Sequence, residues 1–131
     1  MNFKRILVLF ISLIMLVSLV SCDVSSYKAL MLVRITKDDF CEVSFSYLDG
    51  ELVMKPRYTV ADEGQIHYTA HLDEGEINVY YECASGVKEL LFNIKAGEDL
   101  DSRGGYTERG RQKIYIETVT PAKGKITLEF E

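Results

Sequence analysis

The feature that most constrains the fold of this chain is an alternation of apolar and polar residues with a period of two. It is clearest at residues 41–47, where Cys, Val, Phe and Tyr take every second position. Successive side chains of a β-strand point to opposite faces, so this pattern predicts a strand with one face in the core and one in solvent. Similar alternation predicts further strands at 27–35, 51–54, 66–72, 77–83, 90–94, 114–116 and 126–130.

Turn signals separate these segments at intervals of about 8–12 residues. Asp49-Gly50 is expected to close a hairpin, because Gly tolerates the positive φ of a tight turn. Residues 73–75 and 121–124 are expected to turn, and residues 95–112, rich in Gly and charge, to form a long loop. The prediction is an all-β domain at residues 27–131. We expect an antiparallel β-sandwich, Greek-key or jelly-roll-like, of about eight strands.

The first 21 residues have a different character. Lys4 and Arg5 precede a run at residues 6–20 that is apolar except for two serines. This run is shorter than the roughly 20 residues that span a bilayer, and its length is typical of the apolar part of a signal peptide.

The run ends in Leu19-Val20-Ser21-Cys22, which resembles the lipobox of bacterial lipoproteins. The resemblance implies that residues 1–21 are removed, that Cys22 receives a diacylglyceryl group, and that residues 22–26 form a short tether. The chain would then be held by lipid at the extracytoplasmic face of a cell membrane. An ordinary secretory signal and an uncleaved anchor are the alternatives.

The net charge of the chain after residue 22 limits the classes of molecule that it is expected to bind. All 20 acidic residues but only 13 of the 15 basic residues follow position 22, so this part carries a formal charge of −7. Nucleic acid and anionic lipid headgroups repel such a domain, so neither is an expected partner.

Cys41 and Cys83 remain once Cys22 is assigned to lipid. Both fall on the apolar face of a predicted strand. An oxidising export route would permit a disulfide between them, and two free buried thiols are the alternative. A catalytic thiol is not expected, because apolar burial raises the pKa of a thiol.

The histidines and the acidic turns are candidate metal ligands. His67 and His71 lie four residues apart, about 13 Å along a strand, which is too far for one ion with bonds near 2 Å. Both are expected on the solvent face. Glu98, Asp99 and Asp101 are a weak candidate for Ca²⁺, which needs six to eight oxygen ligands, and solvated turns are the preferred interpretation. No other cofactor is expected.

The most distinctive part of the predicted loop is the Gly-rich stretch 103–111. Arg103, Arg109 and Arg111 could hold an anion or a carboxylate of a partner, and Tyr106 could stack on it. The alternative is a solvated connection.

The second half of the chain resembles small β-sandwich domains of secreted bacterial lipoproteins. The residues that carry this resemblance are two Glu-Gly-x-Ile segments, at 63–66 and 74–77, the pair Gly97-Glu98, and Lys123-Gly124-Lys125-Ile126. It implies fold and location but no activity. We therefore expect a non-enzymatic binding module that contacts another envelope protein. The alternative is a calcium-dependent, glycan-binding or small-ligand-binding β-sandwich.

Overall fold

The computed structural model describes residues 3–8 and 27–131. The predicted cleavage site, Cys22 and the tether lie outside the described residues. Residues 3–8 form a short helix, and no helix of the described part is long and apolar enough to cross a membrane.

Seven antiparallel strands make up the domain, which confirms the all-β prediction. Their bounds are β1 Tyr27–Leu30, β2 Val33–Lys37, β3 Phe40–Met54, β4 Ile66–Glu82, β5 Lys88–Lys95, β6 Asp99–Gly104 and β7 Lys113–Phe130.

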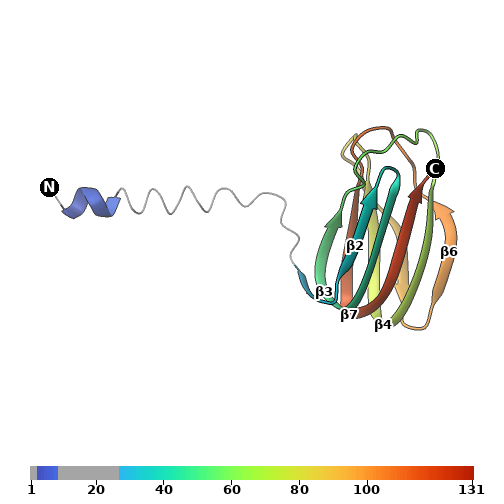
Figure 1. Ribbon diagram of the computed structural model, residues 1–131, viewed down its shortest axis with the longest axis horizontal. Coiled ribbons are helices and arrows are strands. Elements are labelled where there is room, and N and C mark those ends of the chain that lie inside the picture. Colours follow the sequence, from blue (N-terminus) through green and yellow to red (C-terminus); the bar gives the residue numbers. More distant parts are fainter. Residues whose placement is uncertain (1–2, 9–26) are drawn as a thin grey trace.

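Three long strands form the centre of the sheet, in the order β3, β7, β4. Each bends near its middle, at the lower end of Figure 1, so that its two halves lie in opposite layers of a sandwich. One layer, here called the front layer, consists of β2, the first half of β3, the second half of β7, the first half of β4, and β6. In the back layer, the remaining halves of β3 and β4 pair with that of β7, β5 pairs with the second half of β4, and β1 pairs with β3 beside the bend.

Irregularities in β3 and β4 explain how these strands bend without exposing the core. In β3 the buried positions are odd-numbered up to Phe45 and even-numbered from Leu48. In β4 they are even-numbered up to Leu72 and odd-numbered from Ile77. Register shifts accompany both changes. An extra residue in a bulge reverses which face the next side chains meet, so each strand keeps its apolar face inward on both sides of the bend.

Two glycines allow β4 and β7 to touch at the bend. A Cβ on Gly75 would lie 2.2 Å from the carbonyl oxygen of Pro121, and one on Gly124 would lie 2.2 Å from the carbonyl oxygen of His71. Gly75 also has a φ of +86°. Side chains are therefore excluded at both positions by backbone contact, and at Gly75 by conformation as well.

The predicted turns within the long strands are wrong. Asp49-Gly50, residues 73–75 and residues 121–124 mark bends inside β3, β4 and β7, where we expected hairpins between separate strands. The predicted loop 95–112 contains β6, and the predicted first strand is interrupted at Met31, whose φ is +50°. The strand count is accordingly seven for residues 27–131.

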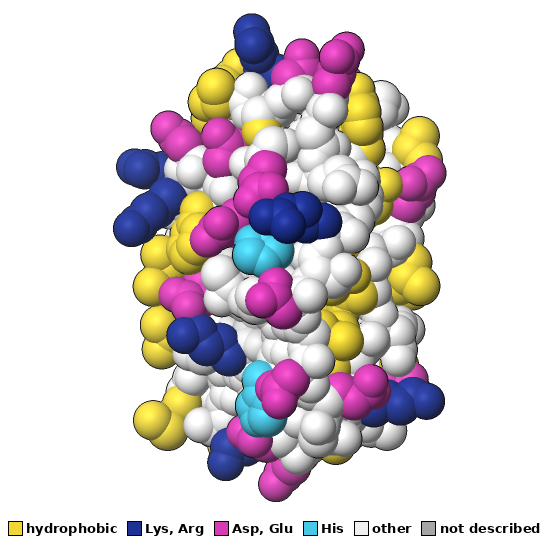
Figure 2. Space-filling model, turned by 90° about the vertical axis from the view of Figure 1, so that its right-hand side faces the viewer, with side chains coloured by type: hydrophobic (Ala, Val, Ile, Leu, Met, Phe, Trp, Pro, Cys, Tyr) yellow, Lys and Arg dark blue, Asp and Glu magenta, His cyan; other side chains and the backbone are white. Residues whose placement is uncertain are grey.

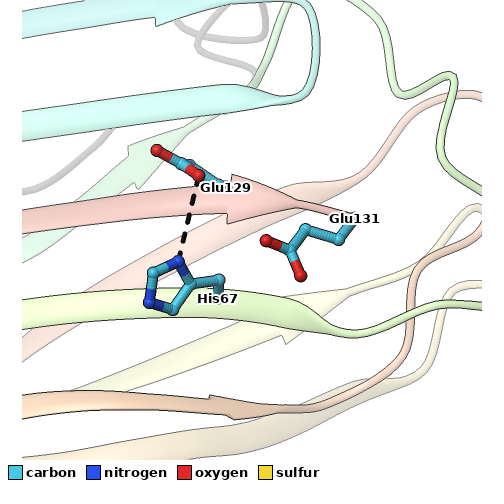
Figure 3. Close-up of side chains that lie close together, drawn as sticks. All are labelled: His67, Glu129 and Glu131. Atoms are coloured by element: carbon cyan, nitrogen blue, oxygen red, sulfur yellow. Dashed lines mark ion pairs between the residues drawn. The ribbon is translucent and has the colours of Figure 1, made fainter.

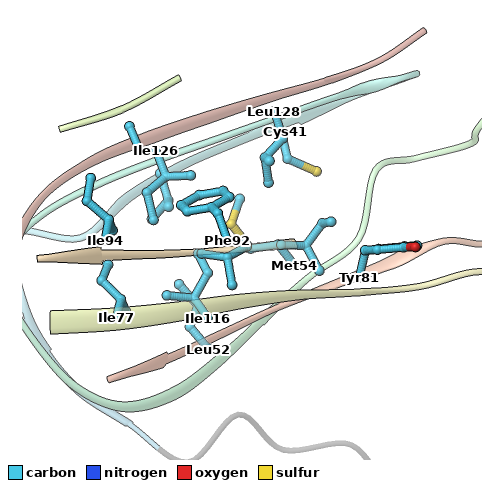
Figure 4. Close-up of a cluster of buried hydrophobic side chains, with 14 of the residues drawn as sticks. Cys41, Leu52, Met54, Ile77, Tyr81, Phe92, Ile94, Ile116, Ile126 and Leu128 are labelled. Atoms are coloured by element: carbon cyan, nitrogen blue, oxygen red, sulfur yellow. The ribbon is translucent and has the colours of Figure 1, made fainter. Parts of the chain in front are cut away.

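The core lies between the two layers. Figure 4 shows side chains of both layers pointing toward one another, among them Leu52, Ile77, Phe92, Ile116 and Ile126. Each of these is at most 6% exposed. Leu90, which the alternation placed inside, is 54% exposed, because a register shift between β4 and β5 turns it outward.

Candidate functional site

The outer face of the front layer, here called the front face, carries a regular array of polar side chains. Three rows cross five strands in the order β2, β3, β7, β4, β6. The rows are Lys37–Phe40–Glu129–His67–Arg103, Ile35–Glu42–Thr127–Thr69–Asp101 and Val33–Ser44–Lys125–His71–Asp99. Apolar residues are confined to β2 and the start of β3, so most of this face can form hydrogen bonds.

A groove follows the third row. It consists of two adjoining hollows of about 460 Å³ and 350 Å³ that share His71 and Lys125. The first is bordered by Met31 and Val33 and the second by Thr69 and Thr127. The front face is therefore shallowly hollowed along this row.

His71 is fixed in orientation at the centre of the groove. Its Nε2 lies 2.7 Å from Oδ1 of Asp73, and its Nδ1 lies 2.5 Å from Oδ1 of Asp99. Hydrogen bonds to Asp73 and then to Asp99 raise the pKa of His71 above 6.5. When His71 is protonated, its imidazolium donates to both carboxylates, and the bond to Asp99 holds β4 against β6.

The groove contains charges of both signs. Asp73, Asp99 and Asp101 stand against Lys123, Lys125 and His71, and Nζ of Lys125 is 2.9 Å from Oε1 of Glu42. The hydroxyls between them come from Ser44, Ser46, Thr69 and Thr127. A neutral molecule with many donors and acceptors fits this lining better than a strongly charged one.

His67 lies in a second ionic cluster on the same face. Its Nδ1 is 3.9 Å from Oε2 of Glu129, and Glu131 lies beside them (Figure 3). In Figure 2 the two histidines, in cyan, each lie among acidic side chains. Nε2 of His67 is 2.7 Å from Asp101, and Nε of Arg103 is 2.9 Å from Glu131. Because a guanidinium already pairs with one of the three groups and repels a cation, we describe this cluster as an ion-pair network.

The three residues suggested for calcium do not surround one point. Glu98 accepts the backbone N–H of Lys95, Asp99 binds His71, and Asp101 binds His67. Among the described residues, the single cluster with metal-ligand spacing is the one around His67, and it includes none of the three. The structure therefore does not bring the three side chains together, and calcium binding stays a prediction that it does not test.

The four residues of the predicted anion-binding loop are separated. Arg103 lies on β6 and pairs with Glu131. Tyr106 lines a small hollow with Cys83 and Val87, whereas Arg111 lines another with Lys55 and Arg57. Arg109 is exposed and lines neither. The structure therefore does not bring the four side chains into one site. Arg111 shares its hollow with Lys55 and Arg57.

The cysteines that could have formed a disulfide are both free and buried. Cys41 pairs across the front layer with Leu128. Cys83 follows the end of β4, where its sulfur lies 3.2 Å from Nε2 of Gln112 and 3.3 Å from the carbonyl oxygen of Tyr106. The two thiols thus belong to different surroundings, and the bridge is not formed. Burial raises the pKa of Cys41 to about 12 and also raises that of Cys83.

The outer face of the back layer offers a ligand less open surface than the front face does. Nζ of Lys88 lies 4.8 Å above the ring of Tyr80 and 4.3 Å above that of Tyr115. The same ammonium is 2.9 Å from Oε1 of Glu117, and the hydroxyl of Tyr115 donates to Glu82. The aromatic surface is therefore covered by an internal cation–π contact.

No family model and no curated protein matches the chain. Among solved structures, it is similar to TmCBM61 in complex with β-1,4-galactotriose, with a TM-score of 0.43 and 17% identity over 69% of this chain and 67% of that one. It is also similar to a family 29 carbohydrate-binding module with mannohexaose (TM-score 0.46, 9% identity, 82% and 79% covered) and to PirA (0.39, 10%, 86% and 99%). At these identities the similarity concerns the β architecture and carries no information on ligands.

Proposed function

We propose that this chain is a lipid-anchored, extracytoplasmic binding domain without catalytic activity, whose groove binds a polyhydroxylated ligand such as a segment of a glycan. The observation that carries the proposal is the lining of the groove. It combines hydroxyls, carboxylates and cations of the second and third rows of the front face.

Sugar hydroxyls both donate and accept hydrogen bonds, so they need both kinds of partner within a short distance. Lys125 supplies a donor, Asp99 and Asp101 supply acceptors, and Thr69 can do either. Met31 and Val33 form an apolar border that can cover the C–H groups of a sugar ring. Each part of such a ligand then has a complementary surface.

The absence of catalysis is inferred from the state of the reactive groups. Both ring nitrogens of His71 are already engaged by carboxylates, so it has no free position for proton transfer. Cys41 and Cys83 are buried thiols with raised pKa values, which disfavours the thiolate that a nucleophile requires.

The test is glycan-array binding by the full chain, compared with His71→Ala and Lys125→Ala. Lys125→Ala removes a charged hydrogen-bonding group, and His71→Ala removes the side chain that holds Asp73 and Asp99 in place, so we expect affinity for any bound glycan to fall by about tenfold in each variant. Arg109→Ala, at an exposed position outside the groove, is the matched control and should bind normally. Binding that survives both groove changes would exclude the groove as the site.

A protein partner is a second candidate, and a specific observation favours it. All five residues of β2 are exposed, and β3 is its single paired neighbour among the described strands. Met31 is 81%, Val33 55% and Ile35 40% exposed. An exposed apolar edge can accept a strand of another protein.

Cross-linking in intact cells separates the two candidates. The variant Ile35→Lys adds charge to this edge at a residue that does not line the groove, and it should abolish a cross-link to an envelope protein, with Lys125→Ala as the control that retains it. A cross-link that persists in Ile35→Lys argues against the β2 edge.

A further inference from the structure

We infer that the hollow between Tyr81, Val87 and Tyr106 binds an organic cation that carries a quaternary ammonium group. This inference is independent of the groove and of its ligand. The hollow has a volume of about 300 Å³ and lies where the end of β4, the start of β5 and the segment after β6 meet. Its lining residues are Tyr81, Cys83, Ser85, Val87, Glu89 and Tyr106.

Aromatic and apolar side chains form most of the wall of this hollow. Tyr81 is 6% exposed and lies at one end of the core, with its hydroxyl pointing away from the other labelled side chains (Figure 4). Tyr106 and Val87 are 45% and 57% exposed, so a ligand can reach both. An aromatic ring attracts a cation to its face through its quadrupole, and proteins use several such rings to bind methylated ammonium groups.

The ring of Tyr81 and the backbone of Tyr106 are held in place by their neighbours. Tyr81 pairs with Glu89 across β4 and β5, and its hydroxyl donates to Oε2 of that carboxylate at 2.5 Å. Gly105 packs on the ring, because a Cβ on it would lie 3.0 Å from Cε1 of Tyr81. The carbonyl oxygen of Tyr106 accepts a hydrogen bond of 3.1 Å from Nε2 of Gln112, which is 1% exposed. The hollow is therefore largely preformed.

The charge of the lining is negative. Glu89 lines the hollow, and no lysine or arginine is among the described residues that do. The hydrogen-bond partner of Glu89 is the uncharged hydroxyl of Tyr81, which does not neutralise the carboxylate. The neighbouring Lys88 binds Glu117 on the outer face of the back layer, where its Nζ lies 2.9 Å from Oε1. A cation in the hollow would therefore meet one carboxylate and no repelling side chain.

Three further carboxylates act on the side of the hollow formed by Tyr106. The N–H of Glu63 donates to the carbonyl of Thr107 at 2.9 Å, which places Asp62 and Glu63 beside the segment that carries Tyr106 and Glu108. Partial burial is the largest cause of the raised pKa of Tyr106, and the charges of Glu63, Asp62 and Glu108 raise it further. In the part of the chain that the structure describes, neither these three carboxylates nor Glu89 forms an ion pair. Their combined field attracts a cation to the hollow.

The kind of cation follows from the hydrogen-bond acceptors that the hollow offers. A primary ammonium has three N–H donors that need acceptors, whereas a quaternary ammonium has none. Glu89 is the one carboxylate in the described lining, and Tyr81, Val87 and Cys83 present mainly apolar surface. A metal ion would need several converging ligands, and the described residues form no such group here. A positive charge surrounded by methyl groups therefore matches both the apolar wall and the negative charge.

The experiment is a titration of the isotope-labelled full chain in mild detergent, followed by amide chemical shifts. The probes are choline, its neutral analogue in which a tert-butyl group replaces the trimethylammonium group, and butylammonium. We expect saturable shifts at residues 81–89 and 105–107 with choline, which weaken as salt is added. The neutral analogue and butylammonium should each bind at least about tenfold more weakly than choline. The inference is overturned if choline does not saturate, or if either of the other probes matches it.

Two pairs of variants test the charge and the ring separately. Glu89→Gln should weaken choline binding about tenfold, whereas Glu74→Gln removes the same charge at an exposed position of the bend and should have no effect. Tyr106→Leu should weaken binding to a similar extent, and Tyr58→Leu, at a tyrosine that is 46% exposed and outside the hollow, should bind normally. Unfolding curves of all four variants establish that they are folded. Equal binding by the two members of either pair would contradict the assigned site.

Discussion

Replacing Gly75 by alanine should destabilise the domain much more than the same replacement at Gly97. The two glycines have nearly equal φ values, +86° and +84°. A Cβ at Gly97 meets nothing within 4 Å, whereas one at Gly75 would lie 2.2 Å from the carbonyl oxygen of Pro121 and 2.8 Å from Cα of Ala122. The comparison therefore separates conformational strain from the backbone contact at the bend.

For Gly97→Ala the expected loss is about 1 kcal/mol in the free energy of unfolding, which is the cost of a positive φ for an L-residue. For Gly75→Ala the same cost applies, and forcing a methyl group against backbone adds roughly 1–3 kcal/mol. We expect a total of about 2–4 kcal/mol. In urea, the difference between the variants corresponds to a midpoint shift of about 1 M.

The assay is urea unfolding of the full chain and both variants, followed by circular dichroism and tyrosine fluorescence. Coincident transitions would establish that the two-state analysis applies. Equal losses in the two variants would refute the close contact between β4 and β7 at the bend, and with it the explanation given for the glycine at position 75.

Three further predictions concern single side chains. In the native protein, Cys41 and Cys83 should resist a thiol-specific reagent and should both react after denaturation without reductant; a disulfide would leave both unreactive. Asp99→Asn should lower the pKa of His71, measured by NMR, and an unchanged titration would contradict its role. Because this pKa is raised in the folded state, the stabilisation by the imidazolium is complete below about pH 6.5 and is lost as the pH rises through the raised value. Cys22→Ala should release the protein from the membrane fraction, and full retention of an unprocessed chain would exclude lipid anchoring.

Much of the fold could be predicted from the alternation of apolar and polar residues. The errors of that prediction have one physical origin. The apolar positions of β4 were predicted correctly on both sides of its bend, whereas Tyr47 of β3, which the alternation placed inside, is 36% exposed. A strand that bends at a glycine and a pair of strands joined by a tight turn have the same local sequence, as Asp49-Gly50 illustrates. Which of them forms depends on long-range pairing, here of β3 and β4 with the single long strand β7.

The candidate sites were harder to predict because they depend on register. Lys125 and His71 are adjacent because β7 pairs with β4 at that position, and nothing in either segment alone indicates it. The outward polar positions of strands 66–72 and 126–130 were the available signal, and they indicated exposure without indicating a groove. Likewise, Arg111 meets Lys55 and Arg57 across more than fifty residues of sequence.

The most direct test of the proposed function is to map where a bound glycan touches the domain. Amide chemical shifts of the full chain would be followed during titration with soluble glycan fragments that bind on the array. We predict that the largest changes fall at residues 44–46, 69–71, 99–101, 123–125 and 127, which line the groove. Changes centred on the outer face of the back layer, or no saturable binding by any fragment, would contradict the proposal.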